Sequence, residues 1–266
     1  MTGRLRGPVV GLALTLLAAA CVREAGSLPG EPTPTVEQRR LTVFAAASLT
    51  GSFREIERDF ELAHEEVDVV LSTGPSDTLA AQIRSEGAAD VFASASGSWM
   101  DAVVRSPGIL YREDFVRNRL IVILPPENPA GIETFEDIAR PGIQLIVAAE
   151  GVPAGDYARE VLRNAGIFDD AIANVVSNEE DVAAVVAKIA ADEADAGIAY
   201  VSDVSVASKH DLASVEIPDE VNVAATYPIA IVAGTAEPEL ARDFIGWMST
   251  AQGKAVLEDY GFETFD

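Results

Sequence analysis

The amino-acid sequence predicts an α/β fold built on mainly parallel β-sheets that are covered by helices. Short apolar segments alternate with amphipathic segments along residues 41–260, and this alternation is typical of parallel sheets with helices on both faces. Hydrophobic residues make up 48% of the 266-residue chain and charged residues 23%, which favours a packed core over disorder. A chain of this length accommodates one large domain or two lobes of roughly 100 residues each.

Each expected strand is a short apolar run. These runs are Leu41–Ala45, Val67–Leu71, Asp90–Ala95, Leu120–Leu124, Leu145–Ala149, Gly197–Tyr200 and Ile229–Val232. The helix after the first strand shows apolar residues at spacings of four, three and four, which places them on one helical face. They are Leu49, Phe53, Ile56 and Phe60. The other expected helices are Leu79–Ser85, a segment ending near Asn164, Val182–Ala191, Pro238–Ser249 and Ala251–Tyr260.

Residues 1–21 have the features of an export signal, since two arginines precede a short apolar run and a group of small residues. The run is too short to span a membrane comfortably. Leu17–Cys21 resembles a bacterial lipobox, in which the cysteine becomes the lipidated first residue of the mature chain. Ala18 departs from that pattern, because a leucine is usual three places before the cysteine. An ordinary secretory signal with an incidental cysteine is the alternative.

Residues 22–40 are rich in proline, glycine and charge, which predicts a solvated linker between the anchor and the folded body. Cys21 is the only cysteine, so an intrachain disulfide and a cysteine-based metal cluster are both excluded. The formal net charge of −24 repels nucleic acid and anionic lipid, and it excludes both as partners. An anionic ligand would be repelled at long range as well, so any anion site must depend on local interactions.

Signatures of catalysis are scarce in this sequence. No phosphate-binding loop with lysine occurs, and neither H-E-x-x-H nor G-x-S-x-G is present. The two histidines, His64 and His210, lie in polar surroundings typical of surface positions. The acidic run Glu179–Asp181 suits the first turn of a helix, where it complements the helix dipole, and a metal site is the alternative interpretation.

Two strand–helix junctions carry hydroxyl residues that could bind an anion. Ligands in α/β folds bind beyond the carboxyl ends of strands, and helix N-termini there present unpaired N–H groups and partial positive charge. Ser48 follows the first strand within Ala45–Thr50, and Ser76 follows the second within Ser72–Leu79. Both serines could donate to an anion, but each could equally be an ordinary helix cap.

Two further junctions offer backbone donors. In Val152–Tyr157 a proline pre-sets a helical start, and Ala154 can offer only its N–H. Val182 opens another expected helix after Asp181, and Tyr200 ends a strand where its hydroxyl could reach a cleft. A plain helix start and a buried tyrosine with a satisfied hydroxyl are the structural alternatives.

Residues 41–266 resemble the periplasmic molybdate-binding proteins of ABC transporters. The resemblance rests on an ordered series of motifs rather than on any single one. They are Val43–Thr50, Pro75–Ile83, Ala89–Ala95, Trp99–Asp101, Val152–Ala158, Glu180–Val182, Gly197–Tyr200, Tyr227–Val232 and Tyr260–Phe262. One departure is Ser72–Pro75, where the family often has a serine-rich run and this chain has Gly74 and Pro75.

The resemblance implies a two-lobe periplasmic binding protein fold of type II, with a hinge that lets the lobes close over the ligand. The pattern of strands and helices places the two chain crossings between lobes at Asn118–Arg119 and Thr226–Tyr227. Lobe I would then comprise residues 41–118 and 227–266, and lobe II residues 119–226. Molybdate or tungstate would be held through its oxygens, without a protein ligand to the metal. The implied contacts are Ser48, Ser76, Ala154, Val182 and Tyr200.

The same resemblance implies an exported monomer, anchored by lipid at Cys21, that needs no cofactor and delivers its ligand to the permease of an ABC importer. Three other functions remain open on the sequence. The scaffold could bind another tetrahedral oxyanion such as sulfate, it could serve a surface sensor without an importer, or its acidic residues could serve a metal-dependent enzyme.

Overall fold

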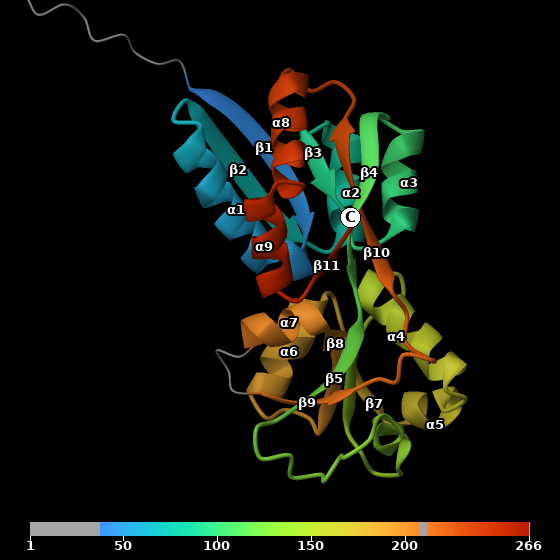
Figure 1. The fold of residues 1–266 in the computed structure, drawn as a ribbon. Helices are drawn as coiled ribbons and strands as arrows, with labels where there is room; N and C mark the ends of the chain where they lie inside the picture. Colours follow the sequence, from blue (N-terminus) through green and yellow to red (C-terminus); the bar gives the residue numbers. More distant parts are fainter. Residues whose placement is uncertain (1–37, 208–211, 266) are drawn as a thin grey trace, which may run out of the picture. The chain divides into compact units, whose positions relative to one another are not determined.

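A computed structural model describes residues 38–207 and 212–265, which form two β-sheets with helices packed against them (Figure 1). The predicted signal peptide with Cys21, residues 22–37 of the predicted linker, and His210 lie outside the described residues. Within the described residues, no helix is both long enough and apolar enough to cross a membrane.

The first sheet has the strand order β11–β4–β10–β3–β1–β2 within the described part of the chain. Its strands are β1 (Arg39–Ala46), β2 (Val67–Gly74), β3 (Val91–Ala93), β4 (Ile109–Asn118), β10 (Ala225–Val232) and β11 (Glu263–Thr264). Strand β1 therefore begins inside the predicted linker 22–40, because the Arg39 amide already donates to the Glu66 carbonyl. Backbone pairing with β2, rather than apolar character, sets that boundary.

Helices cover both faces of the first sheet (Figure 1). They are η1 (Ala47–Leu49), α1 (Thr50–Ala63), α2 (Ser76–Glu86), α3 (Gly97–Arg105), α8 (Pro238–Met248) and α9 (Ala251–Asp259). Side chains of β1 alternate between the two faces, as a strand's period of two requires. Val43 packs in one cluster with Phe53 of α1 and Phe244 of α8, whereas Phe44 joins the opposite cluster with Met100 of α3.

The second sheet has the order β7–β6–β8–β5–β9 within the described residues. Its strands are β5 (Leu120–Leu124), β6 (Leu145–Ala148), β7 (Val175–Glu179), β8 (Ala196–Tyr200) and β9 (Ala213–Glu216). Its helices are η2 (Phe135–Ala139), α4 (Pro153–Asn164), α5 (Phe168–Ala173), α6 (Val182–Ala190) and α7 (Val201–Ala207). Gly197 of β8 allows α6 to pack closely, because a Cβ there would lie 2.8 Å from a Val185 side-chain carbon.

Both sheets are mixed, which corrects the expectation of mainly parallel strands. Strands β2, β1 and β3 are parallel, as are β7, β6 and β8. Strand β10 is antiparallel to β3 and β4, and β5 is antiparallel to β8 and β9. The reason is that the chain leaves the first sheet through β4 and enters the second through β5, with only Arg119 between them, and later returns through β10. A strand that returns in this way runs against its neighbours.

Candidate functional site

Loops that follow three parallel strands of each sheet border one cavity, with about 240 Å³ of space unoccupied by protein atoms when its open mouth is included. Strands β1, β2 and β3 of the first sheet and β6, β7 and β8 of the second all end toward it. Its lining residues are Ala46, Ala47, Ser48, Gly74, Pro75, Ser76, Ala95, Val152, Pro153, Ala154, Asp181, Val182 and Tyr200. The five residues predicted as ligand contacts are therefore brought together around a single space.

Ser48 lies within the short helix η1 and is buried. It is not a helix cap: the residue at the N-cap position is Ala46, and no side chain caps this helix. Instead, the Ser48 Oγ lies 3.0 Å from the hydroxyl oxygen of Tyr227 on β10. The local alternative considered from sequence is thus excluded, and a long-range contact takes its place.

Ser76 is the first residue of α2, directly after Pro75, and its side chain is buried. The Ser76 Oγ accepts a hydrogen bond of 3.1 Å from the Ala95 amide, which follows β3. Because that bond occupies the oxygen as an acceptor, the Ser76 hydroxyl proton remains for another partner. The amides of the first turn of α2 have no acceptor within their own helix, so they add donors at the same place.

Ala154 is the second residue of α4, after Pro153, and is buried at the edge of the cavity. Its side chain offers no polar atom, so only its N–H could serve a ligand. The following residue must be glycine, because a Cβ at Gly155 would lie 2.1 Å from the Ala149 carbonyl oxygen. The start of α4 is therefore pressed against the end of β6, which holds the Ala154 amide at the cavity.

Val182 opens α6, and Asp181 is the N-cap of this helix. The Asp181 side chain accepts from the Ala184 amide at 2.8 Å. That bond directs the carboxylate toward the helix and leaves the Val182 amide without an acceptor in its own helix. Asp181 therefore organises the helix start from the N-cap position, but α6 has no acidic residue in its first turn and Glu179 lies on β7, which corrects the dipole interpretation of the run Glu179–Asp181.

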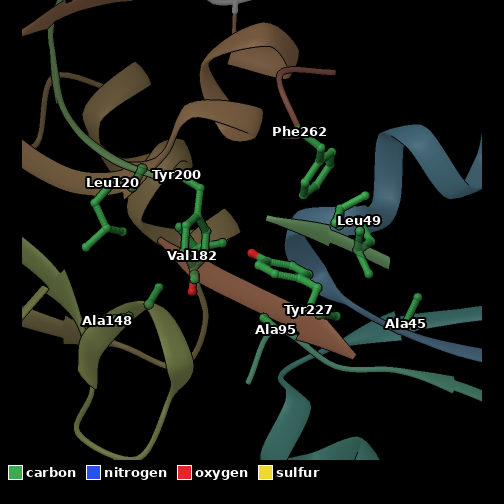
Figure 2. Packing of buried hydrophobic residues seen from close by; sticks show 14 of the residues in the cluster. Ala45, Leu49, Ala95, Leu120, Ala148, Val182, Tyr200, Tyr227 and Phe262 are labelled. Carbon is green, nitrogen blue, oxygen red and sulfur yellow. The ribbon is translucent and has the colours of Figure 1, made fainter. Parts of the chain in front are cut away.

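Tyr200 ends β8 with only 1% of its surface exposed. Its ring meets that of Tyr227 edge-on, with centroids 5.9 Å apart, and Figure 2 shows both hydroxyls near this contact. The Tyr200 hydroxyl makes no hydrogen bond of normal geometry within the described residues, although Tyr227 is close enough to affect its pKa. Burial raises the pKa of Tyr200 well above its usual value, so the group stays protonated and can donate.

No Lys, Arg or His lines the cavity among the described residues. Positive potential there comes instead from the N-termini of α2, α4 and α6, whose first-turn amides and dipoles favour an anion. Hydroxyls of Ser48, Ser76 and Tyr200 add neutral donors. Such a site can hold a compact oxyanion through its oxygens, although the chain as a whole carries a charge of −24.

A hydrogen bond beside the cavity joins a helix of the first sheet to a loop of the second. Trp99 on α3, beside the first sheet, donates its indole Nε1–H to the Gly151 carbonyl oxygen, beside the second sheet, at 2.9 Å. Gly151 lies in the turn between β6 and α4, and its own amide donates to Asp156 at 2.8 Å. This contact lies next to the helix start that carries Ala154.

The sequence analysis assigned no role in the site to three polar residues that lie behind the cavity lining. The Tyr227 hydroxyl lies next to Ser48, and the Asn118 Nδ2 donates to that hydroxyl oxygen. The Asp203 carboxylate accepts from the Tyr200 amide at 3.0 Å. The Asp203 side chain is an acid three residues into α7, a pattern typical of helix starts and therefore visible in the sequence. Burial is the main cause that raises its pKa from 3.8 to about 7, and the nearby Asp181 acts in the same direction.

The other candidates for chemistry have structural roles. The Glu179 carboxylate pairs with Lys188 at 2.7 Å, and the Ser177 hydroxyl donates to it. The His64 ring stacks on Phe60, and its Nδ1 lies 2.9 Å from the Phe60 carbonyl oxygen. Each group is therefore engaged in packing or in a local ion pair, outside the cavity lining.

Comparison with known proteins identifies the family to which this chain belongs. The family model of bacterial extracellular solute-binding proteins matches residues 41–263. The chain belongs to this family. The solute-binding protein is 35% identical to the molybdate-binding protein ModA of Mycobacterium tuberculosis over 261 residues, which cover 96% of this chain and 97% of that one. The resemblance predicted from the ordered motifs is thereby confirmed.

Solved structures show the same fold. The periplasmic molybdate-binding protein of Azotobacter vinelandii matches the solute-binding protein with a TM-score of 0.74 and 21% identity, over 85% of this chain and 100% of that chain. The sulfate-binding protein SubI of Mycobacterium tuberculosis matches with a TM-score of 0.77 and 15% identity, over 86% and 88%. The two-lobe α/β fold is confirmed by these likenesses, which at such identities concern the fold alone.

Proposed function

We propose that this solute-binding protein captures molybdate or tungstate in the cavity between its two sheets and delivers it to an ABC importer. One observation carries the proposal: Ser48, Ser76, Ala154, Val182 and Tyr200, which come from both sheets, converge on one cavity that lacks a cationic side chain. A 35%-identical relative that spans nearly the whole chain is a molybdate-binding protein, which supports this choice of oxyanion.

A doubly charged anion can be held in this cavity without a cationic side chain, for two physical reasons. Water is largely excluded from a closed cavity, so each hydrogen bond to the anion is stronger than in solvent. Distant acidic residues matter little, because salt screens charges beyond about 8–10 Å. A ring of donors of set size would favour molybdate or tungstate over the smaller sulfate, while molybdate and tungstate, which are nearly equal in size, would be hard to separate.

The proposal includes closure of two lobes over the ligand, with lobe I formed by residues 41–118 and 227–266 and lobe II by residues 119–226. Sheet membership supports the first crossing, since β4 belongs to the first sheet and β5 to the second, whereas at the second crossing Ala225 and Thr226 already belong to β10 of the first sheet. Ligand binding would draw the lobes together because donors from each lobe reach one anion only in the closed state.

We also propose that the protein acts as an exported monomer, tethered by lipid at Cys21, with a solvated linker that lets the body reach a permease. The sequence features of residues 1–21 support export, and the family itself is one of extracellular solute-binding proteins. Transport rather than catalysis is the proposed role, and the ligand is the only small molecule that the protein would need.

Isothermal titration of the mature protein with molybdate tests the proposal. Ser48→Ala and Ser76→Ala should each weaken binding by roughly 1–3 kcal/mol, since each removes a hydrogen bond to a charged group. Ser52→Ala is a matched control, because Ser52 is equally buried but donates to the Leu49 carbonyl oxygen outside the cavity lining. Unchanged affinity in both site variants would reject the assignment.

Sulfate is the second candidate ligand, because the sulfate-binding protein SubI shares the fold. A competition titration separates the two functions. If the protein retains its molybdate affinity in a large excess of sulfate, the molybdate proposal stands. If sulfate displaces molybdate at comparable concentration, the protein is a sulfate-type binder and the proposed ligand is wrong.

A further inference from the structure

A chain of buried hydrogen bonds lies directly behind Ser48. The Tyr227 hydroxyl oxygen lies 3.0 Å from the Ser48 Oγ, and the Asn118 Nδ2 lies 3.4 Å from the same Tyr227 oxygen. The Asn118 Nδ2 also donates to the Ser202 Oγ at 2.7 Å, and the Arg119 amide donates to the Asn118 Oδ1 at 3.0 Å. Asn118 and Tyr227 are both wholly buried, so these polar groups depend on one another for partners.

Chemistry fixes the direction of the bonds that Asn118 makes, and these bonds limit what the Tyr227 hydroxyl can do. A backbone N–H can only donate, so the Arg119 amide defines the Asn118 Oδ1 as the acceptor and places Nδ2 on the other side. Because Nδ2 can only donate, the Tyr227 oxygen accepts from it. The single Tyr227 proton is then available for the Ser48 oxygen, which is one of the two directions that the 3.0 Å contact allows and the one that the proposal below adopts.

This polarity decides what Ser48 presents to the cavity. With its oxygen accepting from Tyr227, the Ser48 hydroxyl proton is free to turn toward a ligand. Ser76 has the same arrangement, because its oxygen accepts from the Ala95 amide. If no protein group donates to the serine oxygen, the hydroxyl can rotate and donate its proton to a protein acceptor. Its hydrogen bond to an anion is then weaker.

We propose that Tyr227 and Asn118 are positioning residues for ligand binding, which orient the Ser48 hydroxyl as a donor through a one-way chain of hydrogen bonds. The inference rests on the proposed function, since it assumes that Ser48 contacts the bound oxyanion. Neither residue lines the cavity, so both would act through lining residues, and Ser48 is the one whose Oγ lies 3.0 Å from the Tyr227 hydroxyl oxygen. The chain also begins at Arg119 and passes through β10, the two places where the protein passes between its sheets.

A double-mutant cycle tests the proposal, with molybdate affinity measured by titration of the mature protein. Tyr227→Phe keeps the ring contacts with Tyr200 and Phe262 and removes only the hydroxyl. We expect it to weaken molybdate binding about tenfold, as for one lost hydrogen bond. In a Ser48→Ala background the same change should weaken binding less than about twofold, because the residue through which it acts is gone.

Tyr111→Phe on β4 is the matched control, since it also removes a tyrosine hydroxyl from the first sheet but lies outside the cavity lining. It should leave the affinity unchanged. Asn118→Ala provides a second cycle, with a smaller loss that also disappears in the Ser48→Ala background. Thermal melts of all variants identify any that fail to fold, and the cycle is read from the folded ones.

Two results would overturn the proposal while leaving the proposed function intact. Ser48→Ala could weaken binding while Tyr227→Phe does not, or Tyr227→Phe could cost the same factor with and without Ser48. The second result would mean that the Tyr227 hydroxyl supports the fold but does not orient Ser48. If Ser48→Ala itself leaves the affinity unchanged, the assignment of Ser48 to the site fails, and the positioning role fails with it.

Discussion

Replacing Asp203 by asparagine should remove a pH dependence of stability that this buried acid creates. Asp203 is 8% exposed and accepts from the Tyr200 amide, a bond that the Oδ1 of an asparagine can retain. Burial raises the pKa of Asp203 from 3.8 to about 7, the Asp181 charge adds to the rise, and the Tyr200 bond opposes it. Between these two pH values the folded protein holds a proton that the unfolded chain has lost.

The stabilisation from this proton is present in full below pH 3.8 and is lost as the pH rises to about 7. Each unit of pKa difference corresponds to about 1.4 kcal/mol, so the whole contribution is about 4 kcal/mol. The Asp203→Asn variant has no such group. Its free energy of unfolding, compared with that of the wild type, should therefore improve by about 4 kcal/mol between pH 4 and pH 8.

Urea unfolding at pH 4, 5, 6, 7 and 8 measures this difference for the wild type and the variant. Other carboxylates titrate in both proteins and cancel in the comparison. Asp169→Asn, at an exposed position of α5, is the control for removal of a carboxylate outside the core. A constant difference for Asp203→Asn across this range would refute the reasoning, because it would mean that Asp203 stays charged in the folded protein.

Two further predictions concern the second wall of the cavity. Gly155→Ala should destabilise the fold by roughly 2 kcal/mol or more and weaken ligand binding, because the new Cβ would lie 2.1 Å from the Ala149 carbonyl oxygen. Urea unfolding and ligand titration measure the two effects. Gly246→Ala, in α8 with open space around it, is the control and should change neither stability nor affinity. Trp99→Phe should speed ligand dissociation by roughly fivefold, because the bond to the Gly151 carbonyl oxygen is lost, and a rapid-mixing chase with excess ligand would contradict this if the rate were unchanged.

Much of the fold follows from local sequence patterns. The apolar run Leu120–Leu124 coincides with β5, and the helical stripe that includes Phe53 and Phe60 forms the buried face of α1. Strand β4 was not predicted because it alternates polar and apolar residues without an apolar run. It exists because β10 and β11 pair with it on either side, and no local pattern records that pairing.

Some residues of the candidate site could also be predicted from local sequence patterns, and others could not. Strand ends followed by helix starts are local features, so Ala154 and Val182 could be placed from sequence, with the family resemblance to select them. The contact between Ser48 and Tyr227 could not be placed in this way, because the two residues lie 179 positions apart in the chain. Asp203 carries a local signal, but its raised pKa depends on burial beneath residues from several elements.

The bond between Trp99 and Gly151 has a practical consequence. The chain has two tryptophans, and the second, Trp247 in α8, packs edge-on against Phe60 in the core of the first sheet. Separation of the two sheets would expose the first indole to water and leave the second in its apolar setting. The intrinsic fluorescence of the unlabelled protein should thus contain both a reporter of opening and an internal reference.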